Sequence, residues 1–349
     1  MTATESSAPA LLSRRAAGIA AALSLAPLRA QPRPEKTAPT IAVGGRAAFY
    51  YLPLTIAERL GFFRDEGLDV HIADHAGGAP ALQSVFAGQA DVCAGAFEHT
   101  LSLLLRSQPF RAFVQLGRAP QISVGISHLG GRGPRQAEDL RGRRIGVSAP
   151  GLSTNLVARM LLVRAGVPQE EVAFVGVGTG AAALEALRGR RIDAISNTDP
   201  VMTVLEQRGE VRIVGDTRTL RGTQTLFGGA MPGACLYAPQ RFLRDNPVTA
   251  QALANGVVRA LKWLQTAGPS DLVRAVPEAY MLGDRALYLA AFGKVREAFS
   301  LDGLLAEDGA RTALSALARF EPAFSATRID LRQVYTNSFA AKAKARYQA

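Results

Sequence analysis

Three small hydroxyl side chains gather in one short stretch of the sequence, where an apolar strand is followed by a helix. The stretch is RRIGVSAPGLSTN, residues 143–155, and the hydroxyls belong to Ser148, Ser153 and Thr154. Four roles use such a pattern: a nucleophilic serine, a phosphate-binding loop, a cradle for a polar ligand and a simple helix cap. The rest of the chain decides among them.

The first two roles need residues that this stretch lacks. A nucleophile elbow requires glycine two positions after the serine, and Pro150 stands there. A phosphate loop requires G-x-x-x-x-G-K-[ST], which occurs nowhere in the chain. We therefore expect Ser153 or Thr154 to cap the helix, with N–H groups beyond the cap left to hold a solute.

Other patterns give weaker candidates for cofactor or metal chemistry. GVGTGA, residues 176–181, fits the dinucleotide pattern G-x-G-x-x-G/A, but it falls in the second half of the fold pattern rather than the first. His71 and His75 lie on a predicted strand and its exit loop, so they do not share a helix face as a metal motif requires. Cys93 and Cys235 are too few for a disulfide framework, and we expect two buried thiols, with a single bridge as the alternative. We expect no cofactor and no metal ion.

Strands alternate with helices in two successive sets. The first set has predicted strands at 40–45, 68–74, 91–96 and 111–117, and the second at 143–148, 171–177, 193–197 and 211–217. This alternation predicts parallel βαβ units and an α/β fold. Extended segments at 121–127 and near 229–238 separate and close the sets, which predicts two lobes joined by two crossings. The chain then continues mostly as helices, including 247–267, 285–299 and 308–320.

The loops that follow the strands are where a ligand is expected. In open α/β sheets, ligands bind beyond the carboxyl ends of the strands. Glycines there let the backbone approach a ligand, aromatic rings form apolar walls, and a few polar groups give specificity. The candidate ligand-binding residues are Arg46, Phe49, Tyr50, Gly77, Gly78, Phe97, Glu98, His99, Arg118, Ser148, Ser153, Thr154, Asn155, Asn197 and Asp199. We expect none of them to be catalytic.

Charge and the N-terminus bear on partners and location. The net charge is +11, but the arginines are scattered without interleaved aromatic residues, so we do not expect nucleic-acid binding. Residues 1–30 have the features of an export signal: the pair Arg14-Arg15, an Ala-rich apolar run, and Ala30 before cleavage. The arginine pair favours the twin-arginine route, with the Sec route as the alternative. We expect a periplasmic protein that is soluble after cleavage.

Several blocks of the chain resemble the periplasmic type II solute-binding proteins of ABC importers, in particular the sulfonate, nitrate, taurine and thiamine-precursor group. These blocks include YYLPLTIAERLGFFRDEGLDV, DLRGRRIGVSAPGLSTN and GTGAAALEALRGRRIDAISNTDPV, in the family's order over about residues 40–345. The resemblance implies an α/β fold of the type II periplasmic binding proteins, with two doubly wound lobes. The implied partition gives lobe 1 residues 38–124 and 232–349, lobe 2 residues 128–228, and a two-crossing hinge near 121–128 and 228–235.

The resemblance also implies a role. Such a protein captures one small solute between its lobes and delivers it to a membrane permease with its ATPase, and we expect a monomer that is not an enzyme. A fungal branch of the superfamily makes a pyrimidine by sacrificing its own histidine and binds iron through a cysteine cluster. This chain has two isolated cysteines, so the resemblance does not imply that activity. A sensory binding module and an enzyme on the same fold remain alternatives.

The charge of the solute stays open at this point. Helix N-termini, the three hydroxyls, and Arg46 or Arg118 favour a sulfonate- or carboxylate-like anion. Glu98, Asp199 and the aromatic run FYY favour a flat neutral or cationic heterocycle, such as a thiamine-related pyrimidine. We favour the anion and keep the heterocycle as the alternative.

Overall fold

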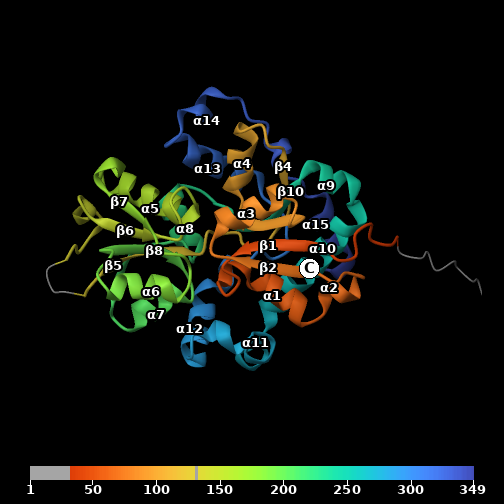
Figure 1. Ribbon diagram of the computed structural model, residues 1–349, viewed down its shortest axis with the longest axis horizontal. Helices are drawn as coiled ribbons and strands as arrows, with labels where there is room; N and C mark the ends of the chain where they lie inside the picture. The colour runs from red at the N-terminus through yellow and green to blue at the C-terminus, as the bar shows by residue number, and fades with distance from the viewer. Residues whose placement is uncertain (1–31, 130–132) are drawn as a thin grey trace, which may run out of the picture. The chain divides into compact units, whose positions relative to one another are not determined.

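The strands of the computed structural model, which describes residues 32–129 and 133–349, form two five-stranded sheets (Figure 1). The first sheet contains β1 (Thr40–Gly44), β2 (His71–His75), β3 (Val92–Ala96), β4 (Phe110–Gln115) and β10 (Ala234–Pro239). The second contains β5 (Ile122–Ser127), β6 (Arg144–Val147), β7 (Ala173–Gly176), β8 (Ala194–Thr198) and β9 (Val211–Asp216). The expected export signal, residues 1–30, lies outside the described residues.

The two sheets share one strand pattern. The order is β2-β1-β3-β10-β4 in the first and β7-β6-β8-β5-β9 in the second. β1 runs parallel to β2 and β3, and β6 runs parallel to β7 and β8. The fourth strand in each order, β10 in the first sheet and β5 in the second, is antiparallel to both of its neighbours. In each case the chain reaches this strand from the other sheet, since β5 follows β4 and β10 follows β9 in the sequence. The parallel βαβ units expected from the sequence are therefore present, and one antiparallel strand in each sheet makes the sheets mixed.

Helices follow the strands as the sequence pattern predicts. Those between the strands are α1 (Leu52–Arg59), α2 (Phe62–Asp65), α3 (Gly78–Phe86), α4 (Glu98–Leu105), α5 (Ser153–Arg164), α6 (Ala181–Arg188), α7 (Val201–Gln207) and α8 (Leu220–Phe227). Those after β10 are α9 (Gln240–Asp245), α10 (Pro247–Thr266), α11 (Pro269–Ala275), α12 (Arg285–Val295), α13 (Glu307–Ala318), α14 (Pro322–Ala326) and α15 (Ser338–Tyr347). Short 3-10 helices are η1 (Phe49–Tyr51), η2 (Ala137–Leu140), η3 (Gln169–Glu171), η4 (Glu278–Met281), η5 (Arg296–Ala298) and η6 (Leu331–Gln333).

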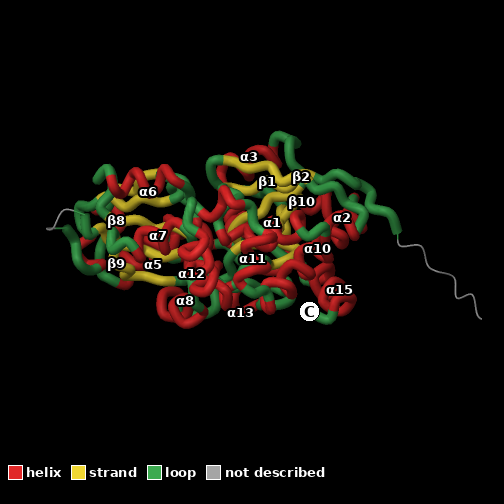
Figure 2. Tube along the Cα trace, turned by 90° about the horizontal axis from the view of Figure 1, so that it is seen from below, coloured by secondary structure: helices red, strands yellow, loops and turns green. Residues whose placement is uncertain are grey.

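Each sheet is covered on both faces, and we call each sheet with its helices a lobe, lobe 1 around the first sheet and lobe 2 around the second. Successive residues of a strand point to opposite faces. On β1, Ile41 and Val43 therefore pack in the apolar cluster beneath α1 and α10, whereas Ala42 packs in the cluster beneath α3 (Figure 2). On β8, Ala194 packs on the face covered by α5, and Ile195 packs on the opposite face, covered by α6 and α7 (Figure 1). This two-sided burial explains why inner strands such as β1 and β3 are almost continuously apolar in sequence.

Two connections carry the chain between the lobes. Residues 116–121 lead from β4 into β5, and residues 228–233 lead from α8 into β10. Cys93 and Cys235 are buried free thiols on the neighbouring strands β3 and β10. Within the described part of the chain, no helix has the length and apolar character needed to cross a membrane.

Candidate functional site

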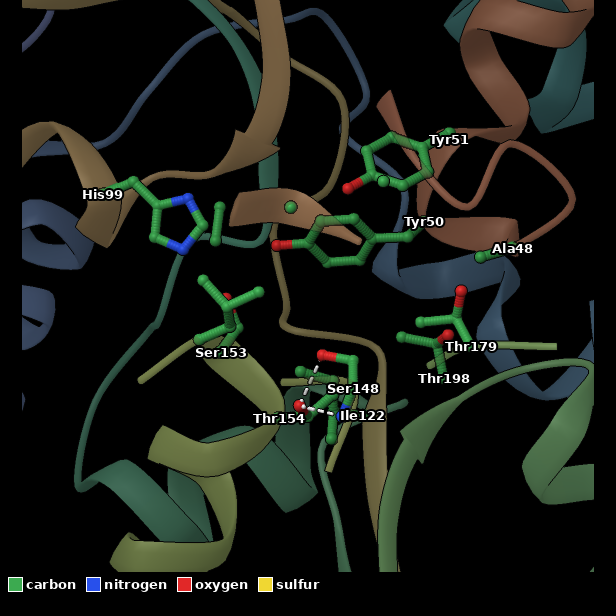
Figure 3. Close-up of a pocket in the computed structure, with 14 residues that line it drawn as sticks. Ala48, Tyr50, Tyr51, His99, Ile122, Ser148, Ser153, Thr154, Thr179 and Thr198 are labelled. Atoms are coloured by element: carbon green, nitrogen blue, oxygen red, sulfur yellow. Dashed lines mark hydrogen bonds between the residues drawn. The ribbon is translucent and has the colours of Figure 1, made fainter. Parts of the chain in front are cut away.

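The strand ends of the two lobes enclose a cavity of about 50 Å³. Gly44 ends β1, Ala96 ends β3 and Thr198 ends β8, while Ser148 directly follows β6. Ile122 belongs to the antiparallel strand β5, so its first residue lies at the same edge. The residues that line the cavity are Gly44, Ala48, Tyr50, Tyr51, Gly78, Ala96, His99, Ile122, Ser148, Leu152, Ser153, Thr154, Thr179 and Thr198 (Figure 3). The cavity therefore lies where an α/β sheet is expected to bind a ligand.

The two lobes touch around this cavity. The backbone N–H of Phe49 in lobe 1 donates a hydrogen bond of 3.1 Å to the carbonyl oxygen of Asp199 in lobe 2. A Cβ added to Gly45 would clash with the Thr179 hydroxyl oxygen, so glycine allows this close approach. The lobes are therefore in direct contact beside the cavity.

Three buried polar atoms at the cavity have no hydrogen-bond partner within the described residues. They are the Tyr50 hydroxyl, His99 Nε2 and the Thr198 hydroxyl. The Tyr50 hydroxyl points toward His99, whose Nδ1 lies 3.3 Å from the Tyr237 hydroxyl (Figure 3). Buried polar groups normally have partners, because an unsatisfied group costs about 1–3 kcal/mol. Their arrangement around one cavity indicates a place where a solute supplies the missing partners.

Burial shifts the pKa values of the titratable side chains at the cavity in the direction that favours their neutral forms. Burial lowers the pKa of His99 to about 4, so its imidazole is uncharged at neutral pH. Burial, and then the charge of Glu98, raise the pKa of the Tyr50 hydroxyl well above its usual value. Glu98 begins α4 just behind the wall, and burial raises its pKa to about 7, although a hydrogen bond from Ser153 opposes part of that rise. Lysine, arginine, aspartate and glutamate are absent from the fourteen lining residues.

The N-termini of three helices meet at the cavity. Gly78 is the first residue of α3, His99 the second of α4, and Ser153 and Thr154 are the first two of α5. The N–H groups of a first helical turn have no partner within their own helix, and the helix dipole places partial positive charge there. The cavity therefore combines backbone donors with uncharged hydroxyl and imidazole groups.

The stretch that begins α5 differs from the expected cap. Leu152 occupies the N-cap position of α5, and no side chain caps the helix there. Instead, the Thr154 hydroxyl accepts a hydrogen bond of 2.9 Å from the Ser148 backbone N–H and lies 2.7 Å from the Ser148 hydroxyl. The prediction that Ser153 or Thr154 is the N-cap was therefore wrong. Thr154 ties the end of β6 to the first turn of α5.

We expect Thr154→Val to lower the free energy of unfolding by about 1 kcal/mol, because the partly buried Ser148 N–H loses its acceptor. Chemical denaturation of the solute-free protein measures this loss. Thr179→Val is the matched control, since the Thr179 hydroxyl also lines the cavity but makes no hydrogen bond to the described residues. Equal losses in the two variants would contradict a specific role for the Thr154 bond.

The candidates from the sequence divide into two groups. Those that line the cavity are Tyr50, Gly78, His99, Ser148, Ser153 and Thr154. Those that lie outside the lining are Arg46, Phe49, Gly77, Phe97, Glu98, Arg118, Asn155, Asn197 and Asp199. The two arginines considered as counter-charges for an anion are both engaged elsewhere. Arg46 pairs with Glu58 on α1, and Arg118 donates from Nε to the Glu297 carbonyl oxygen at 2.8 Å.

The other candidates outside the lining have structural contacts. The Phe49 ring packs 4.5 Å from the ring of Tyr288, and the Phe97 ring lies 6.1 Å from that of Tyr335. Gly77 precedes the first residue of α3. The Asn155 side-chain oxygen accepts from the Gly151 N–H at 3.0 Å, and the Asn197 side chain donates to the Gly178 carbonyl oxygen at 2.8 Å.

The lining residues missed from the sequence are mainly small, apolar or next to a chosen candidate. Thr198 lies between the candidates Asn197 and Asp199 in the sequence. Successive side chains of a strand point to opposite faces, and this alternation at the end of β8 is the signal that could have distinguished Thr198 from its two neighbours. Thr179 lies in the GVGTGA loop that follows β7. Gly44, Ala48, Ala96, Ile122 and Leu152 carry no chemical signal in the sequence.

Two α/β lobes that meet at a small cavity, each with an antiparallel fourth strand that comes from the other lobe, have the arrangement of the type II periplasmic binding folds. A family model described as NMT1/THI5 like matches residues 48–268, and the chain belongs to this family. This confirms the resemblance noted from the sequence blocks.

Solved structures and relatives agree with this assignment. A protein of Bordetella bronchiseptica RB50 is 54% identical, with 91% of this chain and 100% of that chain covered and a TM-score of 0.88. The fold also matches the alkanesulfonate-binding protein SsuA from Xanthomonas axonopodis pv. citri bound to MOPS, with 15% identity, 90% and 98% coverage and a TM-score of 0.66. The putative binding protein YtlA of Bacillus subtilis is 21% identical over 67% of this chain and 68% of its own length.

Proposed function

We propose that this protein is an extracytoplasmic solute-binding protein that captures a small organic solute between its lobes and delivers it to an ABC importer. The observation that carries this proposal is the cavity between the lobes with three unpartnered polar atoms, Tyr50 OH, His99 Nε2 and Thr198 Oγ1, contributed by both lobes. A site completed only when the lobes meet couples solute binding to closure, because solute favours the closed form by its extra affinity for that form. The bending positions in this proposal are the connections 116–121 and 228–233, because β5 itself is hydrogen-bonded on both sides.

The favoured solute is a sulfonate- or carboxylate-like anion with a small apolar body. First-turn N–H groups of α3, α4 and α5 supply donors for an anionic head, and the hydroxyls of Tyr50 and Ser153 lie beside them. Tyr51, Ala48 and Leu152 supply apolar surface for the body. Such backbone and hydroxyl donors can bind an anion without an arginine, and both Arg46 and Arg118 lie outside the cavity lining and have other partners.

A neutral heterocycle of the thiamine-precursor pyrimidine type is the second candidate. The lining carries no ionised side chain, and the imidazole of His99 is held neutral, so a flat uncharged ring meets no desolvation penalty for a charge. The rings of Tyr50 and Tyr51 give it aromatic walls. In both cases the proposed partners are a membrane permease and its ATPase, and the proposed location is the periplasm.

A thermal-shift screen of the protein after signal removal tests the function and separates the two solute classes. Its arms are alkanesulfonates, carboxylates, nitrate, amino acids and pyrimidines, each at millimolar concentration. A solute with micromolar Kd then stabilises the folded state by about 4 kcal/mol. Stabilisation by a pyrimidine alone would exclude the favoured class, and no stabilisation in any arm would contradict capture of a solute of these classes.

Tyr50→Phe tests the cavity itself with a compound that gives a shift in that screen. We expect the affinity to fall about 10-fold, while the free energy of unfolding of the solute-free protein stays the same or rises. The reason is that the Tyr50 hydroxyl is buried without a protein partner, so its removal costs the folded chain no hydrogen bond. Isothermal titration calorimetry and denaturant unfolding measure the two quantities. Unchanged affinity would show that the Tyr50 hydroxyl does not bind the solute.

A further inference from the structure

Helix α12 packs against both lobes at once. On one side, its Tyr288 and Phe292 rings lie 4.5 Å and 6.2 Å from the ring of Phe49, within the apolar core of lobe 1. On the other side, Leu287 joins the apolar cluster that α6 and α7 form in lobe 2. Figure 1 shows α12 between α7 and α11. α12 is therefore a third link between the lobes, in addition to the two chain connections.

Ion pairs strengthen the contact of α12 with lobe 2. Lys294 Nζ on α12 lies 2.7 Å from Glu206 Oε2 on α7, and the same oxygen lies 3.0 Å from Nη1 of Arg218. Arg218, whose side chain is 4% exposed, also pairs with Asp216 at 2.7 Å and with the fully buried Asp199 at 3.5 Å. Lys294 on α12 thus belongs to a network of ion pairs that extends to Asp199, the residue directly after β8.

This network ends at the cavity walls. The Asp199 carbonyl oxygen accepts the hydrogen bond from the Phe49 N–H, the backbone bond that joins the lobes beside the cavity. Thr198 before Asp199, and Ala48 and Tyr50 on either side of Phe49, all line the cavity. Lys294 can therefore influence the site through Glu206, Arg218 and Asp199, although it does not line the cavity.

We propose that α12 is a latch between the lobes and that Lys294 is a positioning residue that favours the closed form without touching the solute. The lobe 1 side of α12 consists of buried rings, whereas the Lys294–Glu206 pair is about one-third exposed on both sides. Opening therefore breaks the lobe 2 side, because separating the buried rings costs more than separating the single apolar side chain of Leu287 and a partly hydrated ion pair. The proposal rests on the lobe closure required by the proposed function, but its test needs no solute.

The test compares the distance between the lobes in solute-free variants. Spin labels attached through Gln83→Cys on α3 and Glu185→Cys on α6 report that distance by pulsed electron paramagnetic resonance, since both positions are exposed and the native thiols are buried. Lys294→Met removes the latch charge and leaves Glu206 paired with Arg218. Lys344→Met is the matched control, because Lys344 makes an ion pair of the same 2.7 Å length with Asp302 inside lobe 1.

We expect Lys294→Met to lower the ratio of closed to open molecules about 2- to 5-fold, the effect of losing one partly exposed ion pair. Lys344→Met should leave the distance distribution unchanged, and Glu206→Gln should reproduce the shift. A distribution in Lys294→Met identical to the parent, or the same shift in Lys344→Met, would overturn the proposal. A shift confined to Lys294→Met and Glu206→Gln would support it even if no solute is found, so the latch and the transport role are tested separately.

Discussion

Glu98→Gln is expected to remove a large pH dependence from the stability of this protein. Between pH 4 and pH 8, the free energy of unfolding of the variant should gain about 3 kcal/mol relative to the parent protein, because each pKa unit corresponds to about 1.4 kcal/mol. Burial raises the pKa of Glu98 from 4.5 to about 7, since the side chain is only 4% exposed at the start of α4. Glutamine has nearly the same shape and does not titrate.

The sign follows from proton binding. Between pH 4.5 and 7 the folded state holds the Glu98 proton more tightly than the unfolded state does. This contribution to stability is therefore fully present below pH 4.5 and is lost as the pH rises through about 7. Denaturant unfolding at pH 4, 6 and 8 measures it in the parent and the variant.

His99 supplies a control with the opposite sign. Burial lowers its pKa from 6.5 to about 4, so its contribution is present above pH 6.5 and is lost as the pH falls through about 4. In His99→Gln, stability relative to the parent should therefore rise toward low pH. Parallel stability curves for Glu98→Gln and the parent would contradict the burial of a titrating carboxyl group at this site.

Gly78→Ala is expected to weaken solute binding about 5- to 150-fold while the protein stays folded. An added Cβ would lie 3.4 Å from the Leu152 side chain and 3.8 Å from the His99 ring, so a methyl group fits but occupies space in a cavity of about 50 Å³. Overfilling a packed site costs about 1–3 kcal/mol, which corresponds to that loss of affinity. Calorimetric titration with a compound identified by the thermal-shift screen measures it.

Gly77→Ala is the matched control for this variant. A Cβ at Gly77 meets no atom within 4 Å, and its φ of 166° is extended backbone that alanine also adopts. Affinity should therefore change only in Gly78→Ala. Equal effects of the two substitutions would indicate that the start of α3 acts through backbone flexibility rather than through space in the cavity.

Local sequence patterns predicted the elements well. The expected helix at 247–267 is α10, Pro247–Thr266, and the expected strand at 40–45 is β1, Thr40–Gly44. Apolar periodicity and flanking turn residues act over a few neighbours, so a single sequence contains that information. The same patterns cannot tell which strands pair, and the antiparallel placement of β5 and β10 was therefore missed.

The site could be predicted by region but not by side chain. The strand-end rule led to loops that line the cavity, as Ser148, Ser153 and Thr154 do. The side chains of long charged residues have many possible partners, and Arg46 pairs with Glu58 at the far end of α1 rather than facing the cavity. Apolar residues such as Ala48 and Ile122 also line the cavity, and they could not be predicted because alanine and isoleucine are equally common in an ordinary core.

The exchange of strands between the lobes has a consequence for the order in which the protein can assemble. All five strands of the second sheet lie between Ile122 and Asp216, in one continuous segment. The first sheet has β10 between β3 and β4, so residues 40–115 leave a gap in it until Ala234–Pro239 arrive. Lobe 2 can therefore complete its hydrogen bonding first, and lobe 1 closes around the returning chain. Folding of lobe 1 must then be the slower event, because its central pairing joins residues more than a hundred positions apart.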